Sequence, residues 1–193
     1  RRILIVDDDE GVREVYRQIF QPNDTGLARL TELVRSDSFR PRAGPASHEH
    51  EHEHEHDQTR QAPLNGVFDI DIAAQGEQGL VLMQQADAEA QPYAVAFIDL
   101  RMPPGWDGLQ TALALREVDP RLYIVIVTAY ADYDIDQLHD ALERDMIFLR
   151  KPFTREEVLQ AARTLCQSWD HRHRLACLTD SLERQVQERT KTL

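Results

Sequence analysis

The chain has 193 residues, of which 41% are hydrophobic, and its formal net charge is -12. This length suits one well-packed domain with additions and is too short for two ordinary domains. The negative charge argues against non-specific binding to nucleic acid or to anionic membrane surfaces. No apolar run is long enough to cross a membrane, and two cysteines (Cys166 and Cys177) imply no disulfide framework. We therefore expect a cytoplasmic protein in which both thiols are buried.

Short runs of β-branched and aromatic residues alternate with helical patterns along the chain. The predicted strands are residues 3–6, 67–72, 93–98, 123–127 and 146–149. The predicted helices are residues 12–20, 77–85, 109–118, 135–144 and a long one from 156. Continuous apolar runs are typical of parallel strands that are covered on both faces. The alternation predicts an α/β fold with a doubly wound, five-stranded parallel sheet in the order 2-1-3-4-5.

Two regions lie outside this alternation. Residues 22–65 form an insertion after the first helix, and it contains the low-complexity tract "HEHEHEHEHD". At the other end, no glycine or proline interrupts the pattern after Thr154, so the last helix spans about 40 residues, or about 60 Å. We expect one domain over residues 1–166 and a helical linker over 167–193. The chain begins without Met and stops inside a helical pattern, so we expect a fragment of a larger protein.

The linker carries a narrow apolar stripe at three- and four-residue steps, made by Leu175, Leu178, Leu182 and Val186. Such a stripe suits a coiled coil, and we expect a homodimer formed through this helix. The alternative is a single amphipathic helix that packs on its own domain.

Polar side chains follow four of the predicted strands at the point where each strand ends. They are Asp7 and Asp8, Asp99, Thr128 and Lys151. In an open α/β sheet, ligands bind beyond the carboxyl ends of the strands, where the strand order reverses. The three aspartates should therefore meet in one crevice, with Thr128 and Lys151 on its far side.

Three carboxylates in one crevice repel one another unless a cation neutralises them. A set of oxygen ligands with room for water suits Mg²⁺. A divalent ion beside a carboxylate nucleophile, a lysine and a hydroxyl provides what phosphoryl transfer needs. In this interpretation Asp99 attacks the phosphorus, and Lys151 neutralises charge on the phosphoryl oxygens.

The motifs "ILIVDDDE", "FIDLRMPPGWDG", "VIVTAY" and "FLRKPF" occur in this order, and together the chain resembles the receiver domains of bacterial response regulators. The resemblance implies a flavodoxin-like fold and a two-component phosphorelay, in which a histidine kinase or phosphotransfer protein donates a phosphoryl group to Asp99. It implies Mg²⁺ ligands of four kinds: Asp8 directly, Asp7 mainly through water, Asp99, and the backbone carbonyl of Arg101. It further implies that Thr128 and Lys151 contact the phosphoryl group and that Phe148 is the rotating switch residue.

Two features depart from the minimal receiver: the insertion, and the loop "MPPGWDG", which is one residue longer than the commonest form. With "FDIDIAAQGEQGL" and the terminal "LERQVQERT", the chain resembles receivers joined to histidine kinase or cyclic-dinucleotide output modules. By this resemblance the fragment is a phosphoacceptor and not an enzyme in its own right, although the full-length protein can be one.

Two alternatives remain open. A phosphohydrolase of the haloacid dehalogenase type uses an Asp-x-Asp nucleophile, which Asp69 and Asp71 offer, but that family places this strand first and the acidic pair last. The second is a metal-sensing segment with imidazole ligands for Zn²⁺, Ni²⁺ or Cu²⁺. Its candidate ligands are His48, His50, His52, His54 and His56.

Overall fold

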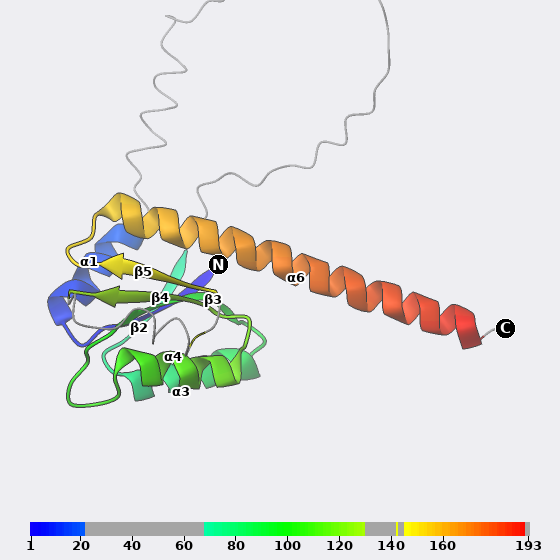
Figure 1. The fold of residues 1–193 in the computed structure, drawn as a ribbon, viewed down its shortest axis with the longest axis horizontal. Helices are drawn as coiled ribbons and strands as arrows, with labels where there is room; N and C mark the ends of the chain where they lie inside the picture. Colours follow the sequence, from blue (N-terminus) through cyan, green and yellow to red (C-terminus); the bar gives the residue numbers. More distant parts are fainter. Residues whose placement is uncertain (22–67, 130–141, 143–144, 192–193) are drawn as a thin grey trace, which may run out of the picture. The chain divides into compact units, whose positions relative to one another are not determined.

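The computed structural model describes residues 1–21, 68–129, 142 and 145–191. Five parallel strands form one sheet in the order β2-β1-β3-β4-β5, as the sequence predicted (Figure 1). The strands are β1 (Arg2–Val6), β2 (Asp69–Ala73), β3 (Tyr93–Asp99), β4 (Tyr123–Thr128) and β5 (Met146–Arg150). The N-terminal strand β1 therefore lies between β2 and β3, and its residue Arg2 is in register with both Asp69 and Tyr93.

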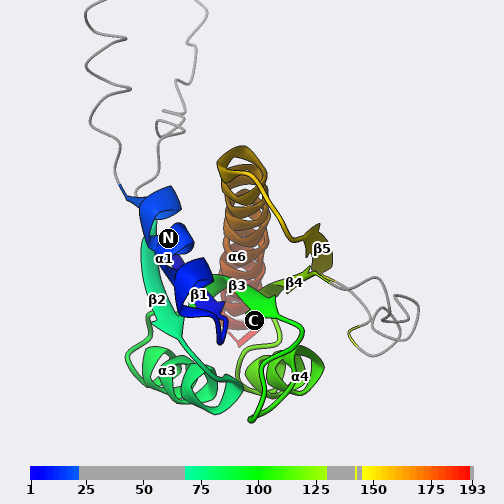
Figure 2. The same cartoon turned by 90° about the vertical axis from the view of Figure 1, so that its left-hand side faces the viewer.

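Helices cover both faces of the sheet (Figure 2). On one face lie α1 (Glu10–Phe20) and α6 (Arg155–Lys191), and on the other lie α3 (Gly76–Ala88) and α4 (Gly108–Val118). These bounds agree with the predicted helices to within three residues, except for the predicted helix 135–144, which lies outside the described residues apart from Leu142.

Successive residues of each central strand enter opposite layers of the core. In β1, Ile3 and Ile5 pack in the layer under α1 and α6, whereas Leu4 and Val6 pack in the layer under α3 and α4. β4 alternates in the same way, and so does β3 from Val95 onward, which explains why their sequences are continuously apolar. The polar residues that follow each strand are therefore fixed by a rigid, buried backbone.

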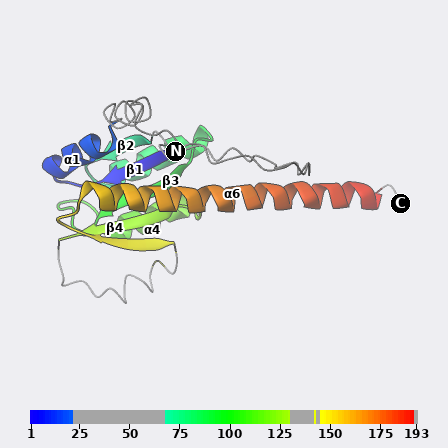
Figure 3. The ribbon, with the colours of Figure 1, turned by 90° about the horizontal axis from the view of Figure 1, so that it is seen from above.

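Helix α6 has two halves with different surroundings. Its first half buries Val158, Ala162 and Trp169 against the sheet. The second half continues past the sheet (Figure 3) and leaves Leu175, Leu178 and Leu182 exposed by 65, 60 and 61%. The expectation of two buried thiols is half wrong, because Cys166 is buried whereas Cys177 lies exposed in this second half.

Contacts group Arg1–Phe20 with Val67–Leu193 into one unit, separate from Gln21–Gly66. The His/Glu tract falls in the second group and lies outside the described residues. Among the described residues, no helix is both long and apolar enough to span a membrane.

Candidate functional site

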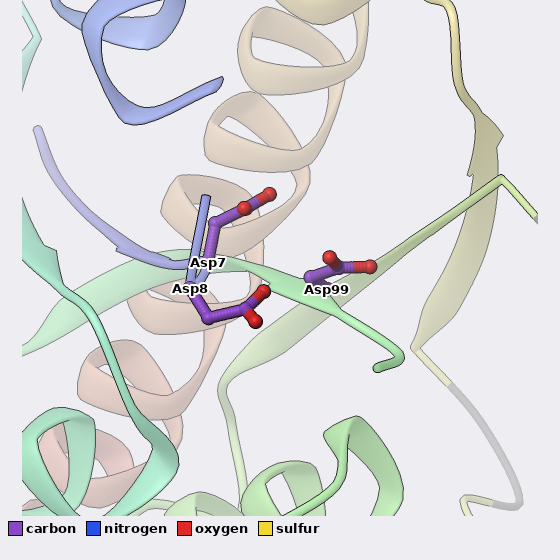
Figure 4. Close-up of side chains that lie close together, drawn as sticks. All are labelled: Asp7, Asp8 and Asp99. Carbon is purple, nitrogen blue, oxygen red and sulfur yellow. The ribbon is translucent and has the colours of Figure 1, made fainter. Parts of the chain in front are cut away.

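Three carboxylates gather at the carboxyl end of the sheet, as the strand ends predicted. Asp7 and Asp8 directly follow β1, and Asp99 is the last residue of the neighbouring strand β3. One carboxylate oxygen from each lies within 4.8 Å of the others (Figure 4). The Asp7 residue is only 1% exposed, so its charge is held largely out of water.

Lys151 joins two of these carboxylates. It follows β5, and its Nζ atom donates to Asp7 Oδ2 at 2.8 Å and to Asp99 Oδ2 at 2.9 Å. The backbone N–H of Lys151 also donates to the carbonyl oxygen of Thr128 at 2.8 Å, so the ends of β4 and β5 are tied together beside the cluster. The structure thus brings Asp7, Asp8, Asp99 and Lys151 into one group, with Thr128 at its border.

The electrostatics of this group leave an excess of negative charge. Burial is the largest influence on Asp7 and raises its pKa, although the hydrogen bond and the charge of Lys151 oppose this shift. For Lys151, burial alone would lower the pKa, but the hydrogen bonds to Asp7 and Asp99 outweigh it and the pKa is raised. Burial, and then the charges of Asp7 and Asp99, also raise the pKa of the Tyr16 hydroxyl on α1.

Three carboxylates and one ammonium group leave two negative charges when all are ionised. All the side-chain atoms that could ligate a metal are carboxylate oxygens, and Asp8 remains partly open to solvent. A hard divalent cation that keeps some of its water, such as Mg²⁺, matches both the charge and the donor type. The residues present therefore fit Mg²⁺.

Hydrogen bonds hold the loop between β1 and α1. Asp9 caps α1 by accepting from the backbone N–H groups of Gly11 at 2.7 Å and Val12 at 3.2 Å, and its own N–H donates to Asp7 Oδ1 at 3.0 Å. The guanidinium of Arg13 donates to the carbonyl oxygens of Asp7 and Asp8, both at 2.7 Å. The sequence interpretation missed both residues. An aspartate just before a helix is a common N-cap and could have identified Asp9, but no sequence signal indicates the contacts of Arg13.

The loop after β3 approaches Asp99 through its backbone. Gly108, the first residue of α4, donates its N–H to the carbonyl oxygen of Leu100 at 3.0 Å. A Cβ atom at this position would lie 2.4 Å from the carbonyl oxygen of Asp99, so only glycine fits. Arg101 lies in this loop, two residues after Asp99.

The predicted switch residue and the alternative nucleophiles lie elsewhere. Phe148 is a half-buried residue of β5, opposite Ile126, and packs against the core layer under α3 and α4. Asp69 and Asp71 belong to the edge strand β2. The Asp71 carboxylate accepts from Arg2 and from the Tyr93 hydroxyl, both at 2.8 Å, and is thereby engaged at the other end of the sheet.

A family model for the response regulator receiver domain matches residues 56–163. The chain belongs to the receiver-domain family. The matched range begins after β1 and α1, so Asp7 and Asp8 lie outside it, yet the structure places β1 inside this receiver's sheet, between β2 and β3.

Relatives in the comparisons agree with this assignment. The receiver is 26% identical over 111 residues to the osmosensing histidine protein kinase SLN1 of Saccharomyces cerevisiae, an alignment that covers 57% of this chain but 9% of that protein. It therefore spans about a tenth of the length of this curated relative.

Solved structures show the same fold at low identity. One is the N-terminal domain of a response regulator/sensory box/GGDEF three-domain protein from Carboxydothermus hydrogenoformans, with a TM-score of 0.54 and 15% identity, covering 89% of this chain and 98% of that one. Another is the CheX–CheY–BeF₃–Mg²⁺ complex from Borrelia burgdorferi, with a TM-score of 0.53 and 20% identity, covering 85% of this chain and 87% of that one.

Proposed function

We propose that this receiver accepts a phosphoryl group on Asp99 in a Mg²⁺-dependent reaction within a two-component phosphorelay. The observation that supports this most strongly is the juxtaposition of Asp99 with Asp7, Asp8 and the ammonium group of Lys151. The similarity to a solved CheY bound to Mg²⁺ and BeF₃ supports the same cofactor, because BeF₃ occupies the place of a phosphoryl group in such complexes.

In the proposed reaction a carboxylate oxygen of Asp99 attacks the phosphorus of a phosphohistidine. The new bond joins this oxygen to phosphorus, the phosphorus–nitrogen bond breaks, and the imidazole leaves with its electron pair and takes up a proton. Lys151 then stabilises the equatorial phosphoryl oxygens, and the Thr128 hydroxyl donates to one of them. When bound, Mg²⁺ supplies further positive charge to these oxygens.

The remaining residues have supporting roles in the proposal. Asp8 holds the ion directly, Asp7 holds it mainly through water, and the backbone carbonyl of Arg101 completes the protein ligands with Asp99. Movement of Thr128 toward the phosphoryl group draws Phe148 inward and changes the surface around β5. The chain itself acts as a phosphoacceptor and not as an enzyme with an external product.

The donor is a histidine kinase or a phosphotransfer protein, and the setting is the cytoplasm. The similarity to a histidine protein kinase and to a GGDEF-containing response regulator supports an attached output module of one of these two kinds. We further propose a domain over residues 1–166 and a linker over 167–193. This linker forms a weak parallel homodimer through Leu175, Leu178 and Leu182, whose exposure on α6 supports such pairing.

The phosphoacceptor is tested with Mg²⁺ and a small acyl phosphate as donor. The wild type should gain one base-labile phosphoryl group by mass spectrometry, and Asp99→Asn should gain none. Asp69→Asn serves as a matched control because it removes the same charge from an exposed position of the same sheet. Undiminished labelling of Asp99→Asn would refute the assignment, and loss of phosphate-ester hydrolysis in the control would instead favour the hydrolase alternative.

The linker is tested by sedimentation of the wild type with and without BeF₃ and Mg²⁺. We expect a monomer–dimer equilibrium that shifts toward dimer with BeF₃, and a variant in which Leu178 and Leu182 are replaced by glutamine should be monomeric in both states. A dimer that survives this replacement would contradict pairing through the linker.

A further inference from the structure

The side chain of Arg13 makes contacts that the proposed reaction does not use. A single atom, Nη1, donates to the carbonyl oxygens of both Asp7 and Asp8, at 2.7 Å each. These two carbonyls belong to the residues whose carboxylates face Asp99. Arg13 therefore binds the backbone of Asp7 and Asp8 and leaves the carboxylates of these two residues free to point into the cluster.

Arg13 lies at a position on α1 where a positive charge is normally unfavourable. It is the fourth residue of the helix, near the end where the helix macrodipole is positive, so a cation is disfavoured there by the helix itself. Its described partners are the two carbonyls and no carboxylate. Arg17, one turn later, instead forms an ordinary exposed ion pair with Glu14 at 3.0 Å. The hydrogen bonds to the loop therefore stabilise a cation at a position where the helix macrodipole disfavours one.

The loop needs such a restraint because its carboxylates repel one another. Asp7 is also held by the N–H of Asp9 and by Lys151. Within the described part of the chain, the carboxylate of Asp8 accepts no such hydrogen bond, so its direction depends on its own backbone. Binding Asp7 O and Asp8 O to one rigid guanidinium fixes the orientation of two successive peptide groups. This in turn fixes the directions in which the two side chains leave the backbone.

We propose that Arg13 is a positioning residue for the cation site, which holds the Asp7–Asp8 backbone so that both carboxylates face Asp99 before Mg²⁺ binds. The inference rests on the proposed function, because it assumes that the acidic cluster takes up Mg²⁺. Outer contacts of this kind change metal affinity by about 10- to 100-fold when they are removed.

The experiment is a calorimetric titration with Mg²⁺ of the wild type, Arg13→Met, Arg13→Lys and Arg17→Met. Arg13→Met keeps a long aliphatic stem but loses both donors, and it should bind Mg²⁺ about tenfold more weakly. Arg17→Met removes the same charge from the same helix and should bind within about twofold of the wild type, because its pair is exposed. Arg13→Lys keeps a cationic donor and should recover part of the loss.

A second readout separates positioning from a general loss of structure. In labelling with an acyl phosphate, Arg13→Met should need more Mg²⁺ to reach half its maximal rate, and saturating Mg²⁺ should restore the maximal rate to that of the wild type. A merely structural role would instead lower the rate at every Mg²⁺ concentration. If Arg13→Met does not fold, the comparison of Arg13→Lys with the wild type gives the same two readouts.

The outcomes distinguish the two proposals. A wild type that binds no Mg²⁺ would overturn the proposed function, and the role of Arg13 with it. A wild type that binds Mg²⁺ while Arg13→Met binds it equally well would overturn the role of Arg13 alone. Equal weakening of Mg²⁺ binding in Arg13→Met and Arg17→Met would also overturn the role of Arg13, because the effect would then come from net charge.

Discussion

At the amino end of the sheet, three acidic side chains each have their own arginine partner: Asp71 with Arg2 at 2.8 Å, Asp119 with Arg121 at 2.9 Å, and Asp145 with Arg172 at 2.5 Å. At the carboxyl end, Asp7 and Asp99 share one lysine, and Asp8 lies beside them. These three carboxylates are therefore paired one to one, whereas the three carboxylates at the carboxyl end have one cation among them. An excess of buried negative charge costs stability, and its presence at one end supports the proposal that a cation binds there.

The largest loss of stability is expected from Lys151→Met, at the carboxyl end of the sheet. The variant leaves Asp7 and Asp99 without their shared cation, and their side chains are only 2 and 12% exposed. Without Mg²⁺ at neutral pH, the free energy of unfolding should fall by about 3 kcal/mol, measured by urea denaturation. Added Mg²⁺ should recover part of this loss.

The matched variant at the amino end is Arg172→Met. The arginine side chain is 43% exposed, but that of its partner Asp145 is only 15% exposed. Removing the arginine leaves one carboxylate without its cation and not two, so it should cost about half as much as Lys151→Met, and Mg²⁺ should not change the result. Equal losses in the two variants would break the contrast between the two ends of the sheet.

Stability and Mg²⁺ affinity should both depend on pH through the carboxylate of Asp7. Burial raises the pKa of Asp7, so the folded protein takes up a proton there before an ordinary aspartate would. The stability that this group contributes without Mg²⁺ is therefore greatest at low pH and is lost as the pH rises through its folded pKa. Protons and Mg²⁺ compete for the same carboxylate, so Mg²⁺ affinity should fall by up to about tenfold per pH unit below that pKa.

Calorimetric titrations with Mg²⁺ at neutral and mildly acidic pH measure this dependence. An affinity that stays constant over this range would show that Asp7 does not titrate in competition with the ion. The exposed ion pair of Arg17 with Glu14 lies outside the cluster, so Arg17→Met should leave the pH dependence unchanged.

The smallest effect is expected from Asp71→Asn at the amino end. The amide can still accept one hydrogen bond from Tyr93 or Arg2, so the free energy of unfolding should fall by about 1 kcal/mol or less. Phosphorylation of Asp99 and Mg²⁺ affinity should not change. A loss of either would mean that the two ends of the sheet are coupled.

The sequence predicted the strands, their order and the meeting of Asp7, Asp99 and Lys151, because these follow from regular patterns. A buried parallel strand has a continuous apolar sequence, and the carboxyl ends of parallel strands share one edge of the sheet. This reasoning located the β1 carboxylates although they lie outside the range that the family model matches.

The contacts of Arg13 and Arg172 could not be predicted in the same way. Arg13 binds backbone carbonyls of a loop, and Arg172 binds the carboxylate of Asp145, a residue with a positive φ of 59° just before β5. Such contacts depend on loop conformation and on where a long side chain can reach, and neither leaves a periodic signal. The exposure of Cys177 was missed for a related reason, since the cysteine follows the point where α6 stops packing on the sheet.

The place of β1 between β2 and β3 has a consequence for dissecting the protein. This strand is separated in the sequence from both of its neighbours, yet it contributes Leu4 and Val6 to one core layer and Ile3 and Ile5 to the other. A polypeptide expressed from residue 56 onward, where the family match begins, would lack it. It would leave facing edges of β2 and β3 unpaired and both core layers incomplete, a combination that favours aggregation over folding. The first 20 residues are thus indispensable to any folded receiver cut from this chain.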